Sequence, residues 1–330
     1  MSGATTTALD TTETTRRAPA FADLPTLPDR DEHHAWDVWG RADEIGTLNL
    51  IGPEQRLAAA RTVRSGEMVS LTLPLDEPDP GLFDERSCYR HVVEDTAAGH
   101  DDRLDEFYLQ GSSQWDGLRH INAGRHGYWG GRTEHDLATS DVLGIDRWAE
   151  HGFGGRGVLI DVAGHLAARG TPLAADEPVE ITSALLDEVA GAQGTTFASG
   201  DVLVVRTGWT EWYRALPAEH RARLRGTIGS GFACPGLEST KDMAGYLWDH
   251  EFAAVAMDNV GVEVFPVDRA KGFLHRRLIA LQGMPLGELW HLADLAERCR
   301  ERSSHEFLLV SGVLPLPRGV GSPANAHALL

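Results

Sequence analysis

The segment QGSSQWDGLRH, residues 110–120, places two amides, a carboxylate and an imidazole close together. In an extended strand alternate residues share one face, so Gln110, Gln114 and Asp116 can converge on one point. A carboxylate flanked by amide oxygens suits a hard or borderline metal cation. His120 follows closely and could reach over such a site as a ligand or as a general base. The same spacing also fits an exposed strand edge that carries ordinary polar residues.

A second pair of candidate ligands lies far along the chain, in HRRLIALQGMPLGELW, where His275 stands first and Glu288 near the end. The pattern between them predicts a helix that ends near Gly283, a turn through Pro285 and a second helix. Such a turn can bring both side chains to one site. By itself, a His and a Glu of this kind are more often an ordinary surface pair.

Several other chemistries fit the sequence poorly. There is no GxSxG nucleophile elbow, and Cys234 has no identifiable histidine partner, so serine and cysteine hydrolase mechanisms are disfavoured. GFGGRG at 152–157 precedes a strand, whereas a dinucleotide-binding fingerprint follows one. The formal net charge of −19 argues against a nucleic-acid partner. Asp258 and Asn259 follow an apolar strand and could either line the site or form a turn.

Composition is that of an ordinary globular protein, with 42% hydrophobic and 24% charged residues. No apolar run approaches the ~20 residues that span a bilayer, so we expect no membrane partner. Residues 1–35 begin with a Thr/Ala-rich stretch and are predicted to form a disordered or extended tail. Three cysteines without a CxxC pair fit neither a disulfide framework nor a zinc knuckle, and we expect a cytoplasmic protein.

The elements that must position the candidate ligands alternate along the second half of the chain. Continuous apolar runs predict strands at 157–162, 201–209 and 307–317, and the segment 240–266 predicts a helix followed by a strand. Earlier, Pro53 suits the first turn of a helix, and 68–75 is a strand candidate. Strands that are apolar on both faces and separated by helices indicate a largely parallel or mixed sheet covered on both sides. The polar segment 76–105 is predicted to be a surface excursion, and GVGSPANA at 319–326 a loop.

These segments together resemble the metal-dependent cyclase family that includes bacterial kynurenine formamidase and isatin hydrolase. That family carries an HxGTHxDxPxH segment, with which residues 110–120 align without gaps. Asp116 falls on its aspartate and His120 on its last histidine, while Gln110 and Gln114 stand at the two earlier histidines. Leu118 stands at the proline, which resembles a longer branch with a QWDGLxH-type segment. WGRADEIGTLNLI, GRGVLIDV, DVLVVRTGW, AVAMDNVGVEVFP and LHRRLIALQGMPLGELW resemble further family blocks in the expected order.

The resemblance implies one α/β domain over residues 36–330, of the swivelling β/β/α type, with a mixed sheet and flanking helices. It also implies that His275 and Glu288 are the family's later metal ligands. Because glutamine is a neutral and weaker ligand than histidine, we expect one divalent ion rather than two zinc ions. Asp116, His275 and Glu288 would hold it with help from Gln114, and the ion would be Mn²⁺ or Zn²⁺.

The function implied is hydrolysis of an amide, lactam or lactone of a small aromatic metabolite, with a metal-activated water and with His120 moving protons to the leaving group. Gln110 and the rings of Trp115, Tyr128 and Trp129 are predicted to line the substrate pocket, with core packing as the alternative role of the rings. Two other functions stay open: a metal-dependent cyclase or dehydratase of antibiotic-type metabolism, and a metal-free, non-catalytic member of the fold. The family also implies a homodimer or homotetramer.

Overall fold

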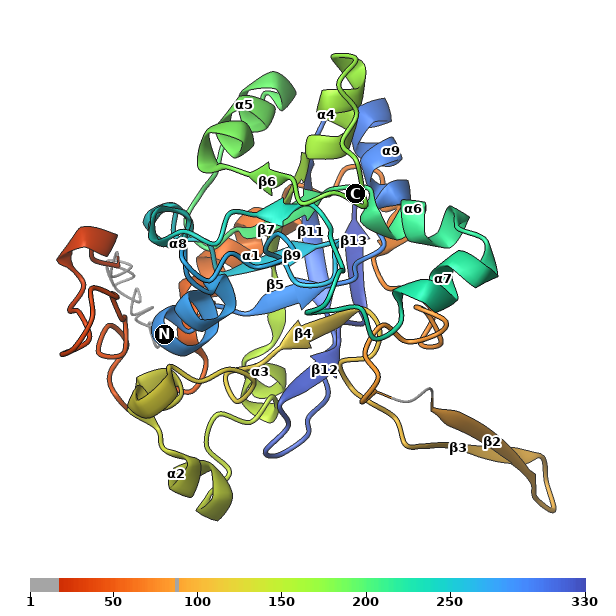
Figure 1. Cartoon of the computed structure of the whole chain (residues 1–330), viewed down its shortest axis with the longest axis horizontal. Helices are drawn as coiled ribbons and strands as arrows, with labels where there is room; N and C mark the ends of the chain where they lie inside the picture. The colour runs from red at the N-terminus through yellow and green to blue at the C-terminus, as the bar shows by residue number, and fades with distance from the viewer. Residues whose placement is uncertain (1–17, 87–88) are drawn as a thin grey trace, which may run out of the picture.

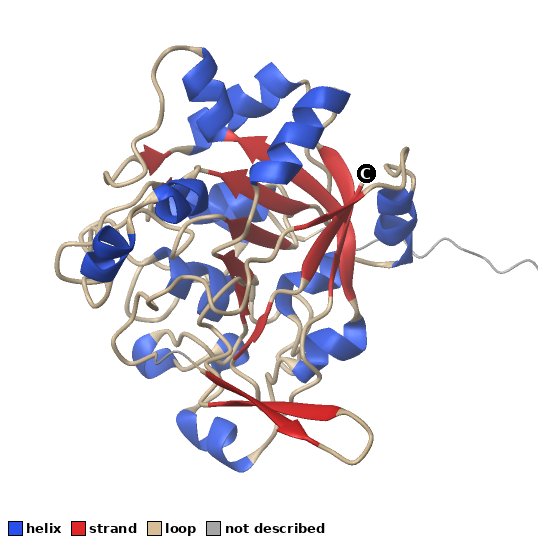
Figure 2. Cartoon of the chain, turned by 90° about the vertical axis from the view of Figure 1, so that its right-hand side faces the viewer, coloured by secondary structure: helices blue, strands red, loops and turns tan. Residues whose placement is uncertain are grey.

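The computed structural model describes residues 18–86 and 89–330. Its centre is a nine-stranded sheet in the order β1-β13-β11-β5-β7-β9-β10-β4-β12, with helices on both sides (Figures 1 and 2). The strands of this sheet are β1 (Met68–Ser70), β4 (Gln114–Asp116), β5 (Phe153–Asp161), β7 (Val202–Arg206), β9 (Ala254–Met257), β10 (Leu286–Glu288), β11 (Glu306–Ser311), β12 (Gly321–Pro323) and β13 (Ala326–Leu329). Strands β5, β7, β9 and β10 run parallel, and the strands outside them pair antiparallel. The predicted mixed sheet is confirmed.

The α-helices are α1 (Pro53–Ala60), α2 (Glu134–Thr139), α3 (Asp146–His151), α4 (Val162–Ala168), α5 (Ser183–Gln193), α6 (Trp209–Ala215), α7 (Ala218–Leu224), α8 (Lys241–Asp249) and α9 (Ala293–Arg302). Local sequence sets their ends. Pro53 starts α1, where its missing N–H is no loss, and the Thr182 hydroxyl caps α5 by accepting from the Leu185 amide. Gly194, in the left-handed conformation, ends α5.

Shorter elements complete the fold. The 3₁₀ turns among the described residues are η1 (Phe21–Asp23), η2 (Gly46–Leu50), η3 (Gly124–His126) and η4 (Trp129–Gly131), and η5 (Arg276–Gln282) is a π-helix. Strands β6 (Glu180–Ile181) and β8 (Gly236–Leu237) form a small parallel pair. Strands β2 (Arg90–Asp95) and β3 (His100–Asp105) form a hairpin that projects away from the body (Figures 1 and 2). The second half of the predicted surface excursion at 76–105 is this hairpin.

The core surrounds the central parallel strands. Every residue of β9, and every residue of β7 before Arg206, is buried, as the continuous apolar runs predicted. The ring of Trp115 in β4 stacks on Phe153 at the start of β5 and meets Trp290 edge-on. These contacts fix β4 against the rest of the sheet.

Three expectations about the elements need correction. Packing begins before residue 36, because Leu24 and Leu27 are buried in the core and the Trp248 indole donates to the Pro19 carbonyl; residues 1–17 of the predicted tail lie outside the described residues. The segment after Pro285 forms strand β10 rather than a second helix, which begins only at α9. The predicted loop at 319–326 contains β12 and leads into β13.

Candidate active site

Two neighbouring strands present three of the candidate side chains on one face. Strands β4 and β10 pair antiparallel, with Gln114 opposite Glu288 and Asp116 opposite Leu286. Residues 114 and 116 share a face of β4, and a residue directly opposite one of them points to the same side. The Gln114 amide nitrogen accordingly donates to both carboxylates, at 2.8 Å to Glu288 Oε2 and 3.3 Å to Asp116 Oδ1. All three side chains are buried.

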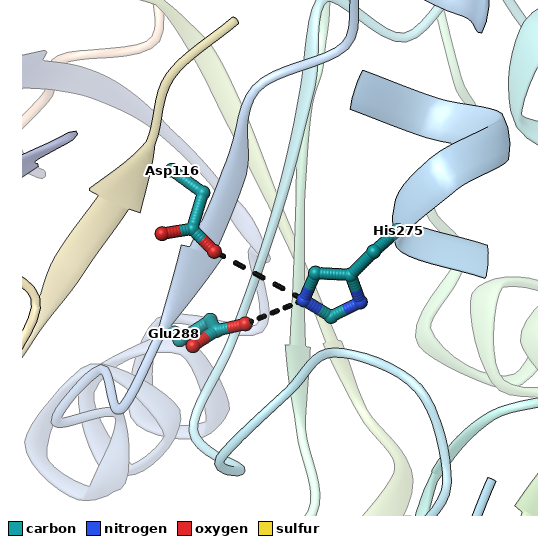
Figure 3. Close-up of side chains that lie close together, drawn as sticks. All are labelled: Asp116, His275 and Glu288. Atoms are coloured by element: carbon teal, nitrogen blue, oxygen red, sulfur yellow. Dashed lines mark hydrogen bonds and ion pairs between the residues drawn. The ribbon is translucent and has the colours of Figure 1, made fainter. Parts of the chain in front are cut away.

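His275 reaches the same point from the start of the π-helix η5. Its Nε2 lies 2.9 Å from Glu288 Oε1 and 3.9 Å from Asp116 Oδ2 (Figure 3). One ligand atom from each of the three residues lies within 4.8 Å of the others. Among the described residues this is the one group of three or more His, Cys, Asp or Glu with such spacing. The two distant stretches singled out in the sequence therefore meet in space.

Glu263, which the sequence analysis missed, holds His275 in position. His275 Nδ1 lies 2.6 Å from the Glu263 carboxylate, and the Leu274 and His275 amides donate to the same group. The Ser239 hydroxyl adds a fourth hydrogen bond. Glu263 thus holds the backbone just before η5 and orients the imidazole so that Nε2 faces Asp116 and Glu288. A signal existed in the sequence, because Glu263 is the one charged residue in the apolar run from Val260 to Pro266.

The electrostatics of this cluster favour a cation. Burial and the nearby charge of Asp116 raise the pKa of Glu288. Burial alone would lower the pKa of His275, but hydrogen bonds to Glu263 and Glu288 raise it well above its usual value. The Asp116 contribution to the first shift and the hydrogen bonds behind the second both come from carboxylates, so negative charge is concentrated around the His275 imidazole.

The donor atoms also suit a divalent ion. Asp116 Oδ2 and Gln114 Oε1 are buried without a hydrogen-bond partner among the described residues. Buried polar oxygens normally have a hydrogen-bond partner or a bound ion. These two unsatisfied oxygens, beside the ligand cluster, are therefore well placed to contact a divalent ion. Ligand bonds of about 2.0 to 2.2 Å put donor atoms roughly 3.3 to 3.6 Å apart around a tetrahedral ion. The observed spacings bracket that range, and the residues therefore fit a single ion held by Asp116, His275 and Glu288.

His120 lies beside Asp116 and is the most accessible member of the group. Its Nε2 is 3.6 Å from Asp116 Oδ2, and its side chain is 23% exposed, compared with 1% for Asp116. Gln110 joins the two, because its amide nitrogen contacts Asp116 Oδ1 and lies 3.2 Å from His120 Nδ1. Burial lowers the pKa of His120, and the carboxylate of Asp116 only partly offsets this effect. The ring is therefore neutral at neutral pH and can accept a proton.

The predicted aromatic residues are not brought to this cluster. Trp115 is fully buried in the core, where its Nε1 donates to the Ser311 hydroxyl. Trp129 is also fully buried and donates to Asp43, and the Tyr128 hydroxyl donates to Glu134. All three rings have the core or structural role that was the alternative prediction.

A different set of rings lines a cavity that adjoins the cluster. This cavity, here called the aromatic pocket, has a volume of about 210 Å³. Gln110, which contacts both Asp116 and His120, forms part of its wall. Its rings are those of Phe83, Tyr89, Phe107 and Tyr108. The sequence analysis missed these rings, since they flank the polar hairpin.

Asp258 and Asn259 shape the turns behind the site. The Asp258 carboxylate accepts hydrogen bonds from the Thr207 amide and hydroxyl and from the Gly208 amide. The Asn259 side chain donates to the Pro235 carbonyl. Of the two roles that the sequence allowed, the structure favours the turn. The two cysteines among the described residues, Cys234 and Cys299, are free and buried.

Comparison with known proteins agrees with this geometry. The sequence model of the Cyclase family matches residues 69–264. The chain belongs to the Cyclase family. A solved structure described as a novel cyclase is 31% identical, covers 90% of this chain and 99% of its own, and superposes with a TM-score of 0.78. Comparison with curated proteins finds no match.

More distant solved structures share the fold of this cyclase-family chain. An isatin hydrolase bound to the product analogue thioisatinate is 15% identical with a TM-score of 0.54, covering 85% of this chain and 99% of its own. Isatin hydrolase A from Labrenzia aggregata, bound to benzyl benzoate, is 16% identical with a TM-score of 0.55, covering 83% of this chain and 97% of its own. Membership of the family indicates an enzyme of the hydrolase or cyclase type. In the part of the chain that the structure describes, no helix has the length and apolar character to cross a membrane.

Proposed function

We propose that this cyclase-family enzyme is a metal-dependent hydrolase that opens an amide, lactam or lactone of a small aromatic metabolite. The observation that carries the proposal is the convergence of Asp116, His275 and Glu288 within 4.8 Å, with His120 beside them. A Mn²⁺ or Zn²⁺ ion held by these three residues would supply Lewis acidity toward a carbonyl oxygen and toward water. Gln114 would assist by keeping its amide against both carboxylates.

The residues around this centre divide the remaining tasks. His120 Nε2 faces the site, and this atom would take a proton from the attacking water and release it to the leaving group. Gln110 holds the ring of His120 against Asp116. Glu263 fixes the direction of His275. The aromatic pocket would bind the ring of the substrate next to the reacting carbonyl, because aromatic side chains pack favourably on flat apolar groups.

Metal analysis and one substitution test this proposal. We expect protein purified without chelator to contain one divalent ion per chain, and Asp116→Asn to lose it, because the isosteric amide removes the negative charge that the ion needs. Asp141→Asn, an exposed aspartate, is the matched control. If wild-type protein binds no divalent ion, and added Mn²⁺ or Zn²⁺ raises neither its melting temperature nor aryl-amide or lactam hydrolysis, the chain is a metal-free member of the fold.

A metal-dependent cyclase or dehydratase is the second candidate, and the family match favours it. The same centre would then polarise a carbonyl toward a nucleophile within the substrate. Running the reaction in water enriched with oxygen-18 distinguishes hydrolysis from ring closure. Hydrolysis places the label in the acid product, and ring closure does not. We also expect a homodimer or homotetramer, which light scattering would measure.

A further inference from the structure

A second cavity lies next to the metal-ligand cluster and shares no lining residue with the aromatic pocket. It has a volume of about 550 Å³, within the range of about 300 to 1,000 Å³ that is typical of small-molecule sites. Its wall includes Phe273 and Arg276, which flank His275 closely in the sequence. The Phe273 ring stacks on the His275 imidazole, with centroids 5.2 Å apart and planes 8° from parallel. We call this the basic cavity.

Four arginines and one acid line the basic cavity: Arg30, Arg269, Arg276, Arg277 and Glu32. Arg277 is neutralised, since its guanidinium pairs with both oxygens of Glu32 at 2.7 and 2.8 Å. It is also fixed by the Ser239 and Lys271 carbonyls. The acid in the wall is therefore fully used by a structural ion pair.

Arg30 pairs with Asp29 at 3.5 Å, whereas Arg269 and Arg276 leave the cavity with an excess of positive charge. No carboxylate of the described residues pairs with Arg269 or Arg276. Arg276 is positioned by its Nε, which donates to the Asn122 carbonyl, while its guanidinium lies over the Phe273 ring at 5.8 Å. In a chain of formal net charge −19, this concentration of unneutralised cations stands out.

The rest of the wall is apolar. Its apolar side chains come from four segments of the chain: Leu27, Ile228, Phe265 with Val267, and Phe273 with Leu281. A wall that combines rings and aliphatic groups with guanidinium donors suits a ligand with an apolar body and an acidic head.

We propose that the basic cavity is a second binding site, which takes a small organic anion: a carboxylate or phosphate carried on an aromatic body. The guanidinium groups of Arg269 and Arg276 bind the acidic head, because planar guanidinium pairs well with carboxylate and phosphate oxygens. The aromatic body lies against Phe265 and Phe273. This inference does not depend on the proposed hydrolase function.

Calorimetry with matched probes tests the site on the full, metal-loaded chain. Phenylacetate and phenyl phosphate carry the two acidic heads, and phenylacetamide is the uncharged match of the first. We expect phenylacetate or phenyl phosphate to bind about tenfold or more tightly than phenylacetamide. Whichever of the two binds more tightly identifies the acidic head, carboxylate or phosphate, that the site prefers. Equal binding of phenylacetate, phenyl phosphate and phenylacetamide, or no binding of any of them, would overturn the proposal.

Substitutions locate the bound anion. Arg269→Glu should weaken binding by about tenfold or more, and Arg276→Gln should weaken it less. Arg300→Glu, on the exposed side of α9, is the control and should leave the affinity unchanged. An anion that instead binds the metal would lose affinity in Asp116→Asn and keep it in Arg269→Glu. That result would place it outside the basic cavity and refute the inference, whereas the opposite pattern supports it.

Discussion

Glu263 shows how the orientation of the candidate ligand His275 depends on a residue outside the Asp116, His275 and Glu288 cluster. It is fully buried, and hydrogen bonds from His275, Ser239 and two backbone amides surround its carboxylate. Burial raises its pKa, but these hydrogen bonds outweigh burial and lower it. The carboxylate therefore stays charged and keeps the Nδ1 side of His275 occupied. Nε2 is then left to face the two other ligands.

Glu263→Gln should weaken metal binding by about 10- to 100-fold, because the amide no longer holds the imidazole through a charged acceptor. The dissociation constant of Mn²⁺ or Zn²⁺, measured by competition with a chelating dye, is the readout. Glu180→Gln serves as control, because Glu180 is a partly exposed glutamate that pairs with Lys271 away from the cluster. An unchanged metal affinity in Glu263→Gln would mean that β4, β10 and η5 alone fix His275.

His120→Gln should keep the metal and lower turnover by about 10²- to 10⁴-fold, the usual contribution of a general acid or base. The pH profile gives a second readout. Since burial lowers the pKa of His120, the ring becomes protonated only below its usual value of about 6.5. Activity that needs the neutral ring should therefore persist below pH 6.5 and fall at still lower pH. In His120→Gln this acidic limb should disappear; loss of metal from the variant would instead identify His120 as a ligand.

At the scale of elements, long apolar strands were predictable and short strands were not. Continuous apolar runs in the sequence predict strands β5, β7 and β9. Strand β10 has only three residues, too few for a period to be detected, and its Glu288 is a good helix former. Pairing with β9 on one side and β4 on the other decides its conformation. The position of Glu288 therefore depended on tertiary contacts that no local pattern contains.

The end of the π-helix η5 offers an element-scale prediction. Gly283 ends this helix with φ of +71°, and a Cβ there would lie 2.9 Å from Gly46 Cα and 3.0 Å from the Trp129 ring. Gly283→Ala should therefore lower the free energy of unfolding by about 1 to 2 kcal/mol for the backbone conformation and about 1 to 3 kcal/mol more for the clash. Gly66→Ala isolates the first effect, because Gly66 has φ of +76° and open space around it. Chemical denaturation measures both, and equal losses would show that the Gly46–Trp129 side yields without strain.

At the scale of the whole molecule, the position of the hairpin explains why the sequence did not predict the aromatic pocket. Residues 76–105 are polar, and their second half, 90–105, forms the projecting hairpin, so this composition indicates a surface loop. The rings lie at the base of the hairpin, where Tyr89 and Phe107 meet edge-on with centroids 5.6 Å apart. A family resemblance could find the candidate ligands on β4 and β10, but it could not show that a polar segment closes one side of a cavity beside them.

The same arrangement predicts that the outer hairpin contributes little to the stability of the chain. Residues 93–102 are all exposed, so they bury no apolar surface against the body. Because Val92 lies opposite Arg103, an Asn-Gly turn can replace 93–102 and keep the strands in register. We expect the free energy of unfolding to change by no more than about 0.5 kcal/mol, as for other surface changes, and the metal content to stay the same. A drop of several degrees in melting temperature, together with a smaller mass in light scattering, would contradict this expectation and place the hairpin in a contact between subunits.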